Sequence, residues 1–140
     1  MTTKYYSSAV ELPFTVNIEG DAASEEIVLM KTSAFRASLS TANHTICEED
    51  VTETEKKILL KELDRLKTEL TLVDETKNKI NRSFAISGAE RALKIKEDLA
   101  KIIDEDKLKS ESALIAARSL FVTANTLKSF FDNCFKCNFM

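Results

Sequence analysis

The strongest constraint on the fold of this chain is a run of apolar residues spaced alternately four and three positions apart. The run comprises Leu59, Leu63, Leu66, Leu70, Val73, Ile80 and Phe84, with Lys77 as its one polar member. Because an α-helix turns once in about 3.6 residues, this spacing keeps one apolar side in line over about four heptads. The pattern predicts a long helix that packs against a partner, either within the chain or in another chain.

The composition also favours long helices. The chain has 140 residues, of which two are glycine and one is proline, and 31% are charged. Few helix-breaking residues argue against an all-β or loop-rich fold. The hydrophobic fraction of 44% is enough for a core, so we expect one domain, with or without a small appendage.

The charge and the distribution of apolar residues restrict which partners and which cellular compartment we expect for this chain. The formal net charge is −3, and lysine and glutamate alternate along the helical region, so no basic face for nucleic acid is expected. No apolar stretch reaches about 18 residues, which predicts no membrane span. The first residues lack the apolar core of a signal peptide. Three cysteines do not indicate a disulfide framework, so we expect a cytoplasmic protein.

The first 50 residues contain the clearest strand signal. Apolar side chains alternate with mostly polar ones at Val10, Leu12, Phe14, Val16 and Ile18, which predicts a half-buried strand. Because Pro13 cannot donate a backbone hydrogen bond, we expect this strand to lie at a sheet edge or to be bulged there. Residues 25–31 and 35–39 are predicted as two further strands of a small antiparallel β unit. The alternative is a helix over Ser24–Leu39 capped by Ser24. We favour the β unit, followed by a connection over 40–51.

Two architectures fit the region 51–140. A capping box of Thr52 and Glu55 predicts the start of a helix over 53–82. A reversal at 83–88 follows, and Ser87 with Glu90 forms a second capping box. Residues 88–133 then form one long helix in an antiparallel hairpin, or reverse near 104–110 in a three-helix bundle. The unbroken three-four spacing leads us to favour the hairpin, in a mainly α (α+β) fold.

No catalytic pattern is evident in the sequence. His44 is the sole histidine, so a serine or cysteine nucleophile has only one candidate base. The chain has no Walker A, dinucleotide-binding or nucleophile-elbow pattern, and two glycines cannot build one. The acidic residues 48–50 are interpreted as a solvated charge run. We expect neither enzymatic activity nor a cofactor.

The candidate metal ligands are two pairs with two-residue spacing, His44 with Cys47 and Cys134 with Cys137. Three thiolates and one imidazole would suit tetrahedral zinc. Spacing alone rarely suffices, so we interpret the cysteines as small reduced hydrophobic residues and expect no bound metal. The helical hairpin would let the two pairs meet, whereas an up-down-up bundle would hold them at opposite ends.

The end of the chain is rich in phenylalanine: Phe130, Phe131, Phe135 and Phe139. These rings either pack on the β unit, which we favour, or anchor in a second chain. Together with the apolar run they are the candidate interaction residues. Leu114, Ile115 and Phe121 lie beside the three-four seam and add further apolar surface.

These features favour a non-enzymatic protein–protein interaction module, such as a scaffold, adaptor or inhibitor. We expect it to self-associate through its amphipathic helices as a homo-oligomer. One alternative is an assembly chaperone for a client protein, for example an accessory protein of a virus. A second alternative is a zinc-stabilised regulator that uses His44, Cys47, Cys134 and Cys137.

Overall fold

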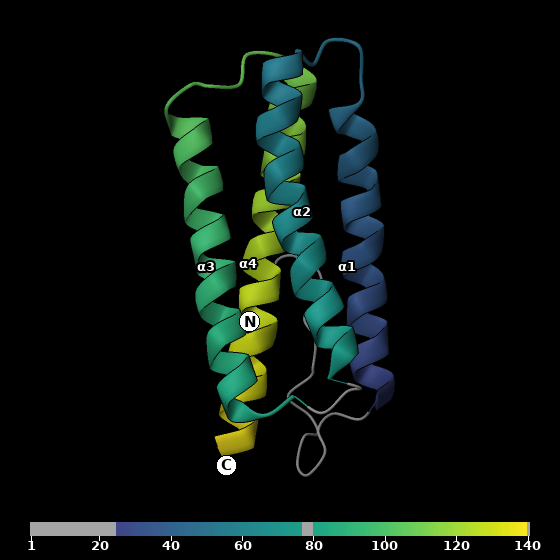
Figure 1. Cartoon of the computed structure of the whole chain (residues 1–140), viewed down its shortest axis with the longest axis vertical. Helices are drawn as coiled ribbons and strands as arrows, with labels where there is room; N and C mark the ends of the chain where they lie inside the picture. The colour runs from purple at the N-terminus through teal and green to yellow at the C-terminus, as the bar shows by residue number, and fades with distance from the viewer. Residues whose placement is uncertain (1–24, 77–79, 140) are drawn as a thin grey trace, which may run out of the picture.

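The described part of the chain forms four helices that run alternately up and down (Figure 1). The computed structural model describes residues 25–76 and 80–139, with side chains described for 32–76 and 80–134. The helices are α1 (Glu25–Ile46), α2 (Glu53–Glu75), α3 (Arg82–Asp104) and α4 (Glu111–Phe139). The prediction of a mainly α fold is therefore confirmed over these residues.

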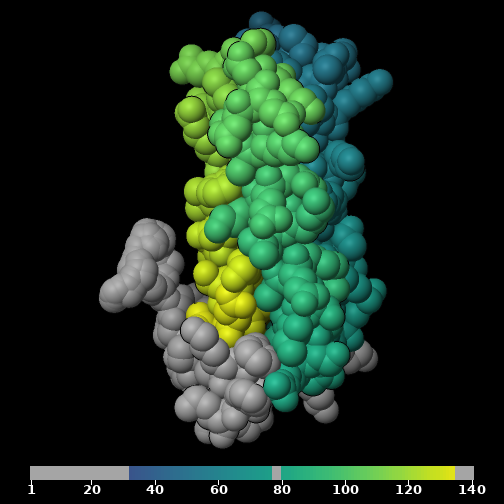
Figure 2. Space-filling view, turned by 90° about the vertical axis from the view of Figure 1, so that its left-hand side faces the viewer, coloured from purple at the N-terminus to yellow at the C-terminus, as the bar shows by residue number. Residues whose placement is uncertain are grey.

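Each helix packs antiparallel to the helix that follows it, and α4 closes the bundle against α1. Helices α2 and α4 also touch across the diagonal, whereas α1 and α3 are kept apart over the described residues. Helices α3 and α4 lie side by side along their length (Figure 2). Both helices bury small residues, among them Ala85, Gly88 and Ala92 of α3 and Ala113 and Ala117 of α4. Small residues at a contact let two helix axes approach closely.

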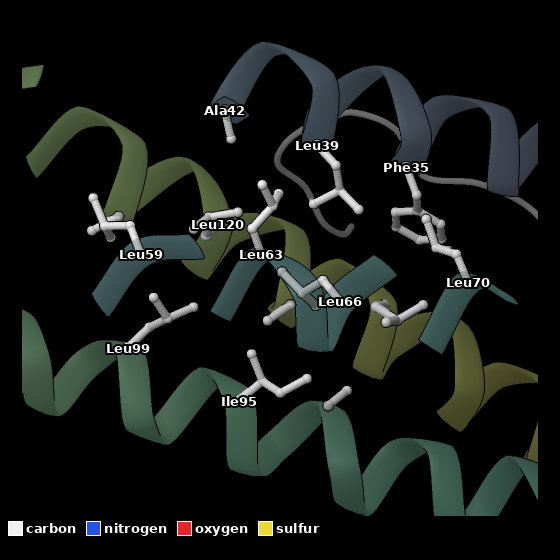
Figure 3. Packing of buried hydrophobic residues seen from close by; sticks show 14 of the residues in the cluster. Phe35, Leu39, Ala42, Leu59, Leu63, Leu66, Leu70, Ile95, Leu99 and Leu120 are labelled. Carbon is white, nitrogen blue, oxygen red and sulfur yellow. The ribbon is translucent and has the colours of Figure 1, made fainter. Parts of the chain in front are cut away.

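The core contains the predicted seam. Leu59, Leu63, Leu66, Leu70 and Val73 are all buried, and the labelled leucines of α2 lie among residues of the other three helices (Figure 3). Phe35 and Leu39 reach them from α1, Ile95 and Leu99 from α3, and Leu120 from α4. The partner of the seam is therefore the same chain.

Helix α1 replaces two of the predicted strands. Residues 25–31 and 35–39 are helical, so the strand predictions there are wrong and the alternative helix is correct. Its buried residues follow the three-four spacing of a helix at Thr32, Phe35, Leu39, Ala42 and Ile46. The predicted connection over 40–51 begins only at residue 47. Ser24 and the strand predicted at Val10–Ile18 lie outside the described residues.

Helix α2 begins as predicted and ends earlier. The capping box is confirmed, because Glu55 N donates to Thr52 Oγ1 at 3.1 Å and Thr52 N donates to Glu55 Oε1 at 2.9 Å. However, α2 ends at Glu75 and not at residue 82. Ile80 lies in the connection to α3. The apolar spacing continues across the break because both helices turn their apolar sides to one core.

The predicted reversal at 83–88 is also wrong, since these residues lie in α3. Asn81 caps that helix, and its Oδ1 accepts from Phe84 N at 2.8 Å. Ser87 and Glu90 lie inside α3 and form no capping box. Asparagine is among the best N-cap residues. Asn81 was not predicted as a cap because it lies between Ile80 and Phe84 of the apolar run, which suggested a continuous helix there.

The single helix predicted over 88–133 is divided in two, so the hairpin is wrong. The chain reverses at 105–110, as the alternative three-helix architecture predicted for 51–140, and α1 adds a fourth helix. Asp106 adopts a left-handed conformation with φ 59°, which aspartate tolerates better than most residues. Leu108 of the connection is buried.

Candidate interaction surface

The structure places the predicted interaction residues inside the chain. Leu59, Leu63, Leu66, Leu70, Val73, Ile80, Phe130 and Phe131 are buried in one hydrophobic cluster. The Phe130 ring packs on Phe35 of α1 with centroids 6.1 Å apart, and the Phe131 ring on Phe84 of α3 at 5.8 Å. Phe130 and Phe131 are thus buried against helices α1 and α3. The side chains of Phe135 and Phe139 lie outside the described residues.

The candidate metal ligands are not brought together. His44 and Cys47 are exposed at the end of α1, whereas Cys134 lies near the end of α4, at the opposite end of the bundle (Figure 1). The side chain of Cys137 is outside the described residues. Among the described residues, no three histidine, cysteine, aspartate or glutamate side chains gather where they could hold a metal ion.

Three buried glutamates on α2 were not predicted. Glu55, Glu62 and Glu69 are one heptad apart and are 3%, 3% and 4% exposed. Glu69 Oε2 accepts from Arg91 Nε of α3 at 2.7 Å, while its Oε1 is buried without a hydrogen bond from the described residues. The seven-residue spacing beside the leucine seam was the signal in the sequence. In the structure this row of carboxylates faces α3 and the start of α4.

Glu62 lies in an ionic cluster with Arg65 and Asp98. Arg65 Nη1 donates to Glu62 Oε1 at 2.8 Å and to Asp98 Oδ2 of α3 at 2.7 Å. Burial raises the pKa of the Glu62 carboxyl; the Arg65 charge opposes this rise and the Asp98 charge adds to it. Asp98 is more exposed, and hydrogen bonds from Arg65 and Lys94 outweigh its desolvation and lower its pKa. The two carboxylates therefore share one arginine unequally.

Glu55 joins the start of α2 to the start of α4. Its Oε2 accepts from the Lys109 and Ser110 amides at 2.6 and 3.1 Å, and its Oε1 accepts from the Ser110 hydroxyl at 2.8 Å. Burial alone would raise the pKa of Glu55, but these bonds and the one from Thr52 lower it to about 2. One carboxylate thus satisfies donors at two helix starts.

Charged residues are distributed unevenly among the helices. Twelve of 23 residues in α2 and nine of 23 in α3 are charged, against four of 22 in α1 and five of 29 in α4. The surface shared by α1 and α4 is consequently poor in charge. The hydrogen bond between the Ser38 and Thr123 hydroxyls, 2.8 Å long, marks where these two helices meet.

We call this surface the α1–α4 face. Helical spacing places eight uncharged residues along it, all at least partly exposed: Ala34, Ser38, Thr41, Thr45, Ile115, Ser119, Val122 and Thr126. Ile115 and Val122 are 49% and 58% exposed, which makes them prominent apolar side chains on the surface. Ile115 was predicted as apolar surface beside the seam. The run of uncharged residues over 119–127 is the signal in the sequence for the part of the face that lies on α4.

The charges nearest this face are mostly paired. Lys128 Nζ lies 2.7 Å from Asp132 Oδ2 on α4, and Arg36 of α1 pairs with Asp74 of α2. Glu111 and Arg118 on the outer side of α4 are exposed, and within the described residues neither forms a salt bridge.

Comparisons with protein-family models, with curated proteins and with solved structures find no significant match to this chain. Over the described residues, none of the helices combines the length and apolar character that crossing a membrane requires.

Proposed function

We propose that this chain is a non-enzymatic protein–protein interaction module that self-associates through its α1–α4 face. The observation that carries the proposal is the combination of low charge and exposed apolar side chains on that face. Interface cores are depleted in charged residues relative to the remaining surface. Contiguous exposed apolar side chains on a protein surface commonly mark a binding site. Such a module would serve as a scaffold, adaptor or inhibitor.

The nature of the face favours a protein as the partner. Among the described side chains on the outer side of α4, Arg118 is the one cation, and phosphate backbones need several clustered cations. Closed homo-oligomers are the commonest assemblies of soluble chains, which supports a second copy as the first partner to test. Cys47 is a free thiol, which suits the cytoplasm as the proposed location.

Sedimentation velocity over a micromolar concentration series tests this proposal. We expect the wild-type chain to sediment above its monomer mass of 15.7 kDa. Ile115→Lys places a charge at an exposed apolar position of the α1–α4 face and is expected to shift the population to monomer. Ile115 is half exposed, so the substitution should leave the helical circular dichroism and the melting temperature almost unchanged.

The matched control is Ile86→Lys. Ile86 is an exposed isoleucine of α3, 38% exposed and outside the α1–α4 face. The Ile86→Lys substitution removes the same side chain and adds the same charge as Ile115→Lys. Because Ile86 lies outside the α1–α4 face, the variant should leave self-association intact. A wild-type chain that stays monomeric throughout the series, or an equal loss in both variants, would contradict the proposal.

A further inference from the structure

The outer side of α4 carries two charges of opposite sign, one on each side of Ile115, and neither forms a salt bridge with any residue that the structure describes. Glu111 and Arg118 are seven residues apart, so they lie on the same side of the helix. Seven residues of α-helix rise about 10 Å, which places each charge about 5 Å from Ile115 along the helix axis. This arrangement is complementary to a copy of itself turned through a half rotation.

We propose that a second copy of this chain packs its α4 antiparallel to α4 of the first, about a two-fold axis at Ile115. The inference rests on the proposed function and specifies its partner and geometry. Ile115 then meets the same residue of the second copy. Glu111 of each copy faces Arg118 of the other, which gives two identical ion pairs around an apolar centre.

The charges discriminate this geometry from its alternatives. A parallel pairing of the two α4 helices would set Glu111 against Glu111 and Arg118 against Arg118. An antiparallel pairing centred midway between Ile115 and Val122 would bring the two Arg118 side chains together at the axis. Like charges in contact oppose association. The antiparallel pairing at Ile115 is the one in which both pairs attract.

The surroundings of this contact allow the two helices to approach. Ser112 and Ser119 flank Ile115 on the side of α1, and their side chains are small and uncharged. Val122 lies two turns from the axis, where it faces the 105–110 connection of the second copy. Both exposed apolar residues of the face are then covered.

Charge reversal tests the geometry with the full chain. Arg118→Glu places Glu111 of each copy against an acidic residue, and Glu111→Arg places Arg118 of each copy against a basic one. We expect each variant alone to dimerise about tenfold more weakly than wild type or worse, as measured by sedimentation equilibrium. The double variant Glu111→Arg/Arg118→Glu restores both ion pairs and should dimerise within about threefold of wild type.

Mixing the two single variants gives the sharpest result. One copy then presents two acidic residues and the other two basic residues, so both contacts attract and a heterodimer should form. Glu90→Arg is the matched control, because Glu90 is an exposed glutamate on α3, and it should not change dimerisation. Circular dichroism of every variant confirms that the helices remain folded.

The failure of this geometry is distinguishable from the failure of the proposed function. If Ile115→Lys disrupts the dimer but the mixture of single variants stays monomeric, the two-fold pairing at Ile115 is overturned while the α1–α4 face stands. If Ile115→Lys leaves the dimer intact, the face itself is wrong. A dimer that both charge reversals leave unchanged also overturns the ion pairs.

Discussion

Two buried glutamates of α2, Glu55 and Glu62, are one heptad apart, yet their surroundings shift their pKa values in opposite directions. Glu55 accepts hydrogen bonds from backbone amides at two helix starts, which favours its charged form. Glu62 is buried beside Asp98 and shares Arg65 with it, and burial disfavours its charged form. The hydrogen-bond donors around each carboxylate, and not burial alone, therefore decide whether its pKa is raised or lowered.

We expect Glu55→Gln to destabilise the fold at pH 7 by about 2 kcal/mol, because a neutral acceptor replaces a carboxylate that several donors share. Glu55 has its pKa lowered from 4.5 to about 2. Its contribution is therefore complete above pH 4.5 and is lost as the pH falls toward 2. Urea unfolding followed by circular dichroism should show the variant and the wild type converging over that interval.

Glu62→Gln is the matched control for this prediction. Its amide oxygen can still accept from Arg65, and the substitution removes a buried charge that Asp98 repels. We expect the variant to be as stable as wild type or more stable at pH 7. Equal destabilisation by both substitutions would mean that burial, and not the donors at the two helix starts, governs these carboxylates.

At the scale of the elements, the interface of α3 and α4 depends on Gly88. A Cβ atom at this position would lie 2.6 Å from Cζ of Phe131, closer than packed side chains tolerate. Phe131 is itself held by contacts with Phe84 and Phe130. The glycine therefore makes room for the largest fully buried side chain of the core.

We expect Gly88→Ala to destabilise the bundle by about 1–3 kcal/mol through overpacking. Helix propensity alone would give the opposite sign, since alanine is favoured over glycine in a helix by about 1 kcal/mol. The melting temperature of the Gly88→Ala variant decides between the two effects: overpacking lowers it, whereas helix propensity alone would raise it. Combining Gly88→Ala with Phe131→Leu should recover part of the loss in a double-mutant cycle, and strict additivity of the two changes would count against the contact.

The elements also show what the sequence could predict. The leucine seam and the Thr52–Glu55 box identify α2 and its start, because both signals are local. The end of α2 was missed because Ile80 lies in a connection yet is buried, which preserves the apolar spacing through that reversal. The end of α3 was missed because the spacing resumes in the same register at Ala113 and Ala116. Helix α1 was missed because the four-residue spacing of Phe35 and Leu39 fits both a strand and a helix. Ala37 between them is exposed, which argues against a strand, but this exposure depends on the tertiary structure and cannot be read from the sequence.

At the scale of the whole molecule, the candidate site was less predictable than the fold. The apolar side of α2 indicated a partner, but only the arrangement of four helices shows that this partner is internal. Once the seam is buried, the surface of interest is the one where α1 and α4 adjoin. These helices are distant in sequence, so no local pattern reveals that their uncharged sides form one face.

The order of the helices has a consequence for how the chain folds. Three of the four neighbouring pairs are also consecutive in sequence, so most contacts close short loops, and such topologies fold within about microseconds to milliseconds. The close α3–α4 pair is the natural nucleus, with α1 docking last. We expect Ala92→Gly to slow refolding in stopped-flow experiments, whereas Leu39→Ala should mainly accelerate unfolding. The opposite partition would place the nucleus at α1, and folding would then begin with the one contact that joins the two ends of the bundle.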